Sequence, residues 1–423
     1  MAWSLSRSPR VDAVFCAPGN AGTASLGTNL PVAAADIPGV LATAREHKID
    51  LVAVGPEDPL AAGMVDELTA AGFAAFGPSK AAARLEGSKW FAKDVMQRAG
   101  VATAPGQAFS DAAAAHTFID ETFATAPVIK ADGLAAGKGV IVPADMAEAH
   151  AAVDELLSGR FGEASARVVV EERLSGLEAS AMAFVDGTTV VPMPFSCDYK
   201  RAFDADAGPN TGGMGVYSPP GFLPNSHAPE VFGAVHDPVV QAMRESESAF
   251  RGVLYAGLMV HEGRSSVIEF NCRFGDPETQ VVLPQLQTDF VDVMEACITG
   301  RLAEQNVTWS GEAAVGVVLA SGGYPGSYAT GLPITGLDAV DDDVTVFHAG
   351  TALSDDGTVL TAGGRVLTVV ARGPTLADAR ARAYDNVARI DFEGRMFRSD
   401  IALREDEALR EDQALREQAP QEL

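Results

Sequence analysis

The sequence predicts a protein of mixed class, with an α/β region first and α+β regions after it. Near the N-terminus, short apolar strands alternate with helical stretches, a rhythm typical of an open parallel sheet. Later strands are joined by short turns that contain glycine, which is typical of antiparallel pairing. At 423 residues the chain is also too long for one ordinary domain, so two to four domains are expected.

Composition indicates a soluble globular protein that binds neither nucleic acid nor membrane. Hydrophobic residues make up 47% of the chain, and the net charge of −26 would repel a nucleic acid. A local basic cluster can still hold a small anion. No apolar run reaches the ~18 residues of a membrane span, and the N-terminus lacks a signal peptide. We therefore expect a cytoplasmic protein, and the four scattered cysteines fit a reducing compartment.

The N-terminal region predicts a parallel sheet with turns after its strands. Ligands of such sheets bind beyond the carboxyl ends of the strands. Two of these turns carry Asn20 and Glu57, which are candidate ligand contacts, although ordinary loop positions are the common alternative. The expected strands are 11–17, 51–54 and 73–76, and the helices between them are 40–48 and 60–71.

A glycine-rich hairpin is predicted over residues 127–142. Glycines let backbone N–H groups approach phosphate oxygens closely, and lysines add point charges. No G-x-x-x-x-G-K-[ST] phosphate loop is present, so a plain turn is the open alternative. Upstream, a helix over 85–99 places Lys89 and Lys93 on one face, a spacing that a solvated lysine pair also explains. The candidate residues of the hairpin are Lys130, Gly133, Gly137, Lys138 and Gly139.

The middle and C-terminal parts predict further strands, helices and a second glycine-rich loop at 208–215. That loop suits either an anion contact or an exposed surface. A separate C-terminal module and an acidic tail, read as a frayed helix or a disordered segment, are expected after residue 300. The expected helices are 147–158, 228–250, 290–300 and 375–390, and the expected strands are 168–174, 179–185, 189–193, 267–273, 314–320, 345–347 and 365–371.

The stretch Val-Ile-Glu-Phe-Asn-Cys-Arg carries the most informative pattern. Side chains alternate faces in a strand, so Ile268 and Phe270 are expected to face a core. The opposite face would present Glu269, Asn271 and Arg273. A carboxylate, an amide oxygen and a guanidinium together suit a divalent cation and a phosphate, because Mg²⁺ takes oxygen ligands that include substrate phosphates. An edge strand with a solvated polar face is the alternative.

Six motifs then point to a family. They are Pro-Gly-Asn-Ala-Gly-Thr at 18–23, Val-Gly-Pro-Glu at 54–57, Leu-Glu-Gly-Ser-Lys at 85–89, Ile-Lys-Ala-Asp-Gly-Leu-Ala-Ala-Gly-Lys-Gly at 129–139, Gly-Pro-Asn-Thr-Gly-Gly-Met-Gly at 208–215 and Ile-Glu-Phe-Asn-Cys-Arg-Phe-Gly-Asp-Pro-Glu-Thr-Gln at 268–280. With these motifs in this order, the chain resembles the phosphoribosylamine–glycine ligase family of the ATP-grasp superfamily, and the resemblance extends over residues 1 to about 400.

The resemblance implies a ligase of purine biosynthesis. Its substrates would be ATP, glycine and 5-phosphoribosylamine, its metal would be Mg²⁺ or Mn²⁺, and we expect a monomer. The implied domains are a substrate domain at 1–85, an ATP-grasp domain at 86–298 with a lid at about 105–185, a C-terminal domain at 299–400 and the tail at 401–423.

The resemblance also implies roles for single residues. ATP would be held by Lys89, Lys130, Gly133, Gly137, Lys138, Gly139, Glu171, Glu172 and Glu178. The metal ligands would be Glu269 and Asn271, and the catalytic residues would be Arg273, Asp198 and Lys200. The other substrates would contact Asn20, Glu57, Asn210, Thr211, Gly212 and Gly213.

The chain departs from the family pattern in two places. The family opens with a strand and a Gly-Asn-Gly-Gly-Arg-Glu-His turn, whereas this sequence is expected to begin inside the helix that follows, as from a misplaced start codon. Many ATP-grasp enzymes also carry an acid on the strand before the metal strand, where this chain has Ala-Gly-Leu-Met-Val at 256–260. Two alternatives stay open, namely an ATP-grasp ligase with another acceptor and a truncated ATP-binding protein without ligase activity.

Overall fold

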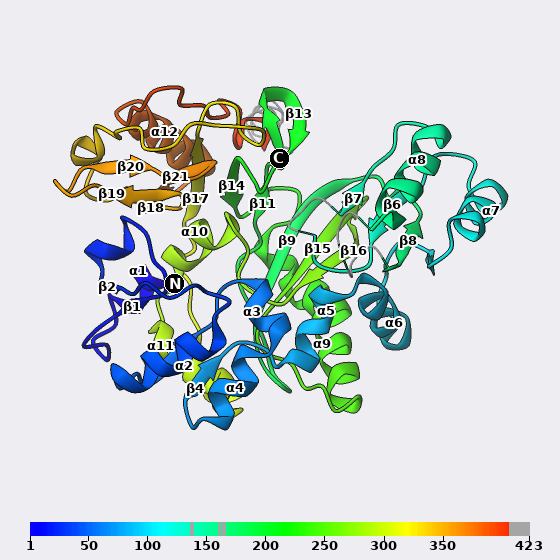
Figure 1. Cartoon of the computed structure of the whole chain (residues 1–423), viewed down its shortest axis with the longest axis horizontal. Helices are drawn as coiled ribbons and strands as arrows, with labels where there is room; N and C mark the ends of the chain where they lie inside the picture. The colour runs from blue at the N-terminus through cyan, green and yellow to red at the C-terminus, as the bar shows by residue number, and fades with distance from the viewer. Residues whose placement is uncertain (136–138, 160–161, 163–165, 406–423) are drawn as a thin grey trace, which may run out of the picture.

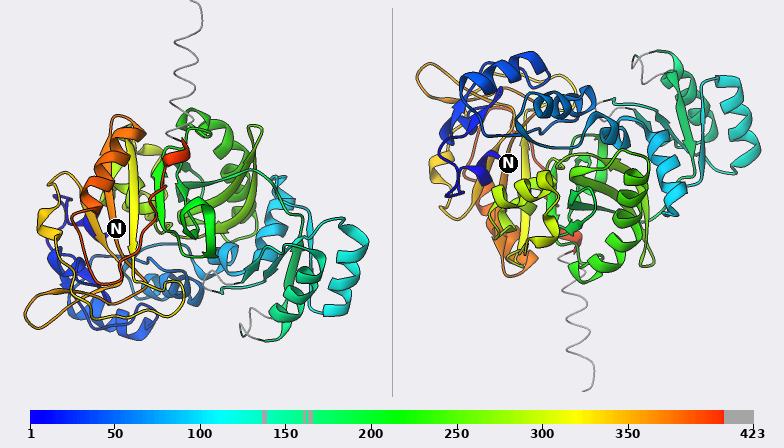
Figure 2. Two further views of the ribbon diagram at one scale, coloured as in Figure 1. Left: turned by 90° about the horizontal axis from the view of Figure 1, so that it is seen from above. Right: turned by 90° about the horizontal axis from the view of Figure 1, so that it is seen from below.

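A computed structural model of the chain describes residues 1–135, 139–159, 162 and 166–405. Figure 1 shows a central antiparallel sheet, with a lid of strands and helices at one end and the N-terminal and C-terminal regions at the other. The two views of Figure 2 confirm that the lid projects from the body. No helix in this described part combines the length and the apolar character that a bilayer crossing requires.

The N-terminal region contains the predicted parallel pairing in two short pieces. Strand β1 (Phe15–Cys16) pairs with β2 (Thr28–Asn29), and β3 (Leu51–Ala53) pairs with β4 (Ala74–Phe76). The chain begins in helix α1 (Ala2–Leu5), as expected. The helix predicted over 60–71 is divided, because Gly63 adopts a left-handed φ of +99° and ends the first part. The other helices are α2 (Ile37–Glu46), α3 (Glu57–Ala62) and α4 (Met64–Ala70).

The central sheet has the strand order β10-β9-β15-β16 and is antiparallel. Alternate residues of β9 enter two separate cores, one shared with α6 and α9 and the other with α11. Helices on both faces explain why the strand is apolar along most of its length. The bounds are β9 (Leu177–Asp186), β10 (Val190–Pro192), β15 (Arg251–His261), β16 (Arg264–Asn271), α6 (Lys89–Ala99), α9 (Ala228–Glu245), α10 (Glu278–Val282) and α11 (Phe290–Thr299).

A β-bulge changes the predicted alternation of β16. Gly257 pairs with Glu269 and Leu258 pairs with Val267, so Ile268 is left without a partner. Val267 and Phe270 therefore both enter the core, while Ile268 lines a cavity. The prediction that Ile268 faces the core was wrong, because it assumed a regular pleat.

The lid consists of an antiparallel sheet with two helices packed on one face. Its strand order is β5-β8-β6-β7, and β6 and β7 form the predicted hairpin. The helix predicted over 85–99 is interrupted at Ser88, whose extended backbone starts a new helix and whose Oγ accepts the Phe91 N–H at 3.1 Å. The bounds are β5 (Gly106–Phe109), β6 (Val128–Ala131), β7 (Val140–Ile141), β8 (Val168–Glu171), α5 (Lys80–Gly87), α7 (Ala112–Thr122) and α8 (Met146–Leu157).

The C-terminal sheet has the order β11-β14-β17-β21-β18, so it includes strands from before residue 299. Helix α12 packs against β17 and β21. Ile401 and Ala402, at the start of the predicted tail, are buried in this core, and residues 406–423 lie outside the described part. The bounds are β11 (Cys197–Asp198), β12 (Arg201–Phe203), β13 (Ala207–Asn210), β14 (Gly215–Ser218), β17 (Ala313–Ala320), β18 (Thr345–His348), β19 (Thr351–Leu353), β20 (Val359–Thr361), β21 (Arg365–Gly373) and α12 (Leu376–Val387).

A buried histidine in the central core predicts a loss of stability in acid. The side chain of His236 on α9 donates from Nε2 to the Ala181 carbonyl at 3.1 Å, and its Nδ1 has no partner among the described residues. Burial lowers the pKa of His236 to about 4. Between pH 6.5 and 4 the imidazole of His236 binds a proton in the unfolded chain but not in the folded chain. Folding stability therefore falls as the pH is lowered. Urea unfolding should show a loss of about 3 kcal/mol from this residue across that window.

The variant His236→Gln retains a donor for the Ala181 carbonyl and removes the titrating ring. Its free energy of unfolding should therefore lack this acid-dependent part. His227→Gln, which changes an exposed histidine just before the same helix, is the matched control and should behave as the wild type. The same pH dependence in His236→Gln and in the wild type would contradict the assignment.

Candidate active site

Two cavities adjoin where the lid, the central sheet and the N-terminal region meet. The lid cavity, of about 190 Å³, has among its lining residues Lys89, Lys130, Glu269 and Asn271. The junction cavity, of about 730 Å³, has among its lining residues Asn20, Gly212 and Arg365. Glu57 and Arg273 line both cavities. A molecule in one cavity can therefore approach a molecule in the other beside these two side chains.

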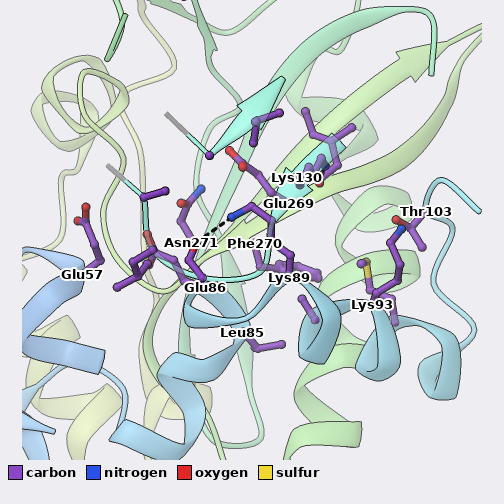
Figure 3. A pocket seen from close by; sticks show the side chains of 18 of the residues that line it. Glu57, Leu85, Glu86, Lys89, Lys93, Thr103, Lys130, Glu269, Phe270 and Asn271 are labelled. Carbon is purple, nitrogen blue, oxygen red and sulfur yellow. Dashed lines mark hydrogen bonds between the residues drawn. The ribbon is translucent and has the colours of Figure 1, made fainter. Parts of the chain in front are cut away.

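Glu269 and Asn271 lie on the same strand and both line the lid cavity, as the sequence predicts. Figure 3 shows them with Lys89 and Lys130 around the same space. Neither side chain makes a hydrogen bond or a close ion pair with another described residue, although the charge of Glu269 acts on Lys89. Oxygen atoms of half-buried side chains that no hydrogen bond occupies fit a divalent cation. The described chain gathers no cluster of three or more His, Cys, Asp or Glu for a metal, so water or substrate oxygens would complete the coordination shell.

Two buried lysines of this region share one carboxylate. Glu171, the last residue of β8, forms ion pairs with Lys130 and, at 2.8 Å, with Lys93. Lys130 also donates to the carbonyl of the bulge residue Ile268 at 2.8 Å, and Lys93 donates to the Ala104 carbonyl at 2.6 Å. Side-chain exposure is 10% or less for all three charged residues. Reading Lys93 as part of a solvated pair is therefore wrong, because the lid covers that face of α6.

Lys89 also lines the lid cavity. Its Nζ donates to the carbonyl of Gly133 in the glycine hairpin at 3.1 Å. Burial lowers the pKa of Lys89, and the carboxylate of Glu269 works in the opposite direction. Gly133 and Gly139 of the hairpin line the same cavity, whereas Gly137 and Lys138 lie outside the described residues. The hairpin thus lies beside the candidate metal strand, as expected.

Arg273 is held between two acidic side chains from the N-terminal half of the chain. Its Nε lies 2.8 Å from Glu57 and its Nη2 lies 3.2 Å from Glu86. Glu86 also accepts the backbone N–H of Cys272 at 2.8 Å, and burial raises the pKa of Glu86 to about 7. Glu86 was not expected from the sequence, although it lies within the Leu-Glu-Gly-Ser-Lys motif.

Three expected site residues form a separate cluster. Lys200 Nζ lies 2.9 Å from Asp198 and 3.0 Å from Glu178. These three side chains line neither of the two cavities. Beneath them, Glu278 is buried and accepts hydrogen bonds from Tyr255 at 2.7 Å and Ser180 at 3.0 Å, and burial together with Asp198 raises the pKa of Glu278. The buried Glu278 was not predicted as a member of this cluster, because it is far along the chain from Glu178, Asp198 and Lys200.

The remaining candidates lie on loops around the junction cavity or apart from it. Asn20 lines the cavity and donates to the carbonyls of His348 at 2.8 Å and Ala349 at 3.1 Å. Thr211 bonds to the Lys200 carbonyl at 2.9 Å, while Asn210 and Glu172 are exposed and line neither cavity.

Gly213 has a structural requirement for glycine. Its φ is +107°, and an added Cβ would lie 2.5 Å from Cδ of Pro277. Residues 208–210 of the predicted loop 208–215 belong to strand β13, and the rest of this loop packs directly on the turn after β16.

Removal of the Glu171 carboxylate, which Lys93 and Lys130 share, should cause a large loss of stability. Glu171→Ala leaves Lys93 and Lys130 buried without a counter-ion, which should lower the free energy of unfolding by about 3–5 kcal/mol. Urea unfolding followed by circular dichroism measures the change. The matched control, Glu172→Ala, alters the exposed neighbour and should change the value by less than about 0.5 kcal/mol. Equal losses in the two variants would contradict the burial of this ion pair.

Known proteins share this arrangement over nearly the whole chain. A solved structure of phosphoribosylamine–glycine ligase from Thermotoga maritima superposes with a TM-score of 0.82 at 35% sequence identity, covering 95% of this chain and 96% of that one. The protein named phosphoribosylamine–glycine ligase from Salmonella typhimurium is 48% identical over 417 residues, which are 96% of this chain and 95% of the relative. The protein of that name from Xanthomonas campestris pv. campestris is 49% identical over 409 residues, covering 96% and 94%.

Family comparison extends this likeness to all three regions. The matches are to the phosphoribosylglycinamide synthetase N domain over residues 1–86, its ATP-grasp (A) domain over 87–279 and its C domain over 314–404. The chain therefore belongs to the phosphoribosylglycinamide synthetase family.

Proposed function

We propose that this chain joins glycine to 5-phosphoribosylamine at the expense of ATP, giving glycinamide ribonucleotide, ADP and phosphate in purine biosynthesis. One observation carries the proposal: a cavity with lysines and metal-type oxygens adjoins a second cavity at Glu57 and Arg273. Such a pair of cavities suits the transfer of an activated group from a nucleotide to an acceptor. Relatives that bear this enzyme's name at 48–49% identity support the assignment.

The lid cavity would take the phosphates of ATP. Lys89 and Lys130 supply positive charge, and Gly133 and Gly139 bring the backbone of the hairpin close. Glu269 and Asn271 would hold Mg²⁺ or Mn²⁺ together with phosphate oxygens. When bound there, the cation offsets repulsion between the phosphates and polarises the γ-phosphoryl group.

The reaction itself requires no protein nucleophile. The carboxylate of glycine attacks the γ-phosphorus of ATP, which forms glycyl phosphate and releases ADP. The amine of phosphoribosylamine then attacks the glycyl carbonyl, forms the amide and expels phosphate. Arg273 lies where the two cavities meet and can stabilise the charge of the phosphoryl group that is transferred. The described hairpin residues that line the lid cavity, Gly133 and Gly139 among them, would help to exclude water from the acyl phosphate.

Other expectations remain predictions. The junction cavity would take phosphoribosylamine beside Asn20, Glu57 and the loop 208–215. The family resemblance assigns ATP contacts to Glu171, Glu172 and Glu178 and catalytic roles to Asp198 and Lys200. The domain boundaries, the cytoplasmic location and the monomeric state also remain predictions.

A coupled assay of ADP release tests the proposed function. The purified chain should release ADP only when glycine and phosphoribosylamine are both present. Glycine-dependent ADP release with a different amine in place of phosphoribosylamine would indicate an ATP-grasp ligase with another acceptor. The absence of ADP release with any amine would contradict a ligase function.

Glu269→Gln tests the metal site. The amide keeps the shape of the side chain and removes its charge, so ADP release should fall at least about 100-fold while circular dichroism and the unfolding midpoint stay near wild type. Glu262→Gln, an exposed position in the turn between β15 and β16, is the matched control and should retain full activity. Wild-type turnover in Glu269→Gln would remove the metal assignment.

A further inference from the structure

Arg365 is an arginine of the C-terminal sheet that reaches two segments of the candidate active site. It is the first residue of β21. Its Nη1 donates to the Gly212 carbonyl at 2.6 Å and to the Asp276 carbonyl at 3.2 Å, and its Nη2 pairs with the Asp276 carboxylate at 2.8 Å. One planar guanidinium thus bonds both to the glycine-rich loop and to the turn that follows the metal strand.

The backbone of Gly212 is held from both sides. Its carbonyl accepts from Arg365, and its N–H donates to the hydroxyl of Tyr324 at 3.1 Å. A Cβ at Gly212 would lie 2.9 Å from Cζ of Arg365, so the loop backbone lies directly against the guanidinium. We call Arg365 and Tyr324 the loop clamp. Both members belong to the C-terminal region, far along the chain from the loop.

The turn on the other side of the clamp leads back to the candidate reacting groups. Asp276 follows Arg273 by three residues, and Gln280 donates to its second carboxylate oxygen at 2.7 Å. Gly212, Asp276 and Arg365 all line the junction cavity, and none of them lines the lid cavity. The clamp therefore shapes the space for the substrates other than ATP.

We propose that Arg365 is a positioning residue of the ligase, which acts with Tyr324 to hold the loop 208–215 and the turn at Asp276 around the amine substrate. The proposal rests on the proposed function. The effect on phosphoribosylamine should be large and the effect on ATP small, because Arg365 lines the junction cavity and does not line the lid cavity. Lysine at position 365 would keep the charge but could not span both partners, since its ammonium is a point charge.

Steady-state kinetics of Arg365→Ala and Arg365→Lys test the proposal. Removing the charged hydrogen bonds should lower kcat/KM for phosphoribosylamine by about tenfold or more in Arg365→Ala, with a partial recovery in Arg365→Lys. The KM for ATP should stay within about twofold of wild type. Arg372→Ala is the matched control, because Arg372 lies on the same strand, pairs with Glu312 at 2.7 Å and lines neither cavity. It should keep wild-type kinetics.

Tyr324→Phe gives a second test that removes only the hydroxyl group. It should act in the same direction as Arg365→Ala and more weakly, whereas Tyr328→Phe, a change to the neighbouring ring, should have no effect. Hydrogen exchange at the amide of Gly212 should be faster in Arg365→Ala and in Tyr324→Phe than in wild type.

The outcomes separate the two proposals. Wild-type protein that lacks glycine-dependent ADP release contradicts the proposed function, whatever the variants do. An active wild type with unchanged phosphoribosylamine kinetics in Arg365→Ala overturns the positioning role. Equal losses for ATP and phosphoribosylamine in that variant also overturn it, because they indicate a general structural defect.

Discussion

The carboxylate of Glu171, shared by two buried lysines, fixes the lid cavity. Lys130 and Glu171 belong to the lid sheet, whereas Lys93 belongs to α6, which packs on the central sheet. Two ammonium groups in a poorly solvated space repel each other, and one carboxylate between them offsets that repulsion. Lys130 also donates to the bulge in β16, so the cluster joins the lid, α6 and the candidate metal strand. This connection holds β6 of the hairpin beside β16, whose pairing with β15 places Glu269 and Asn271.

Much of the fold follows from local patterns in the sequence. The hairpins, the apolar strand β9 and the polar face of β16 were predicted because they depend on alternation and turn residues. The division of two predicted helices was missed, since a left-handed glycine at position 63 and an extended Ser88 interrupt otherwise helical stretches. The bulge at Ile268 was missed for a different reason. It arises from the register with β15, which a single strand does not encode.

The candidate site shows the same limit. Glu269, Asn271 and Arg273 could be found because three functional groups lie on one strand. The burial of Lys93 could not be found from its spacing, because a helix pattern does not say which distant strand will cover it. Glu86, Glu278 and Arg365 contact partners that are far away in sequence. The family resemblance supplied the identity of the motifs, and the contacts between them required the structure.

The strand order of the C-terminal sheet limits where the chain can be cut in protein engineering. Strands β11 and β14 precede and follow the segment that contains β12, β13 and the glycine-rich loop, yet they hydrogen-bond within a sheet whose other members follow residue 312. A fragment that stopped before β17 would leave β14 with an open edge prone to aggregation. Removing the last hundred residues as if they were an independent domain should therefore give insoluble fragments. This applies to domain swaps, to split-protein complementation and to truncation libraries.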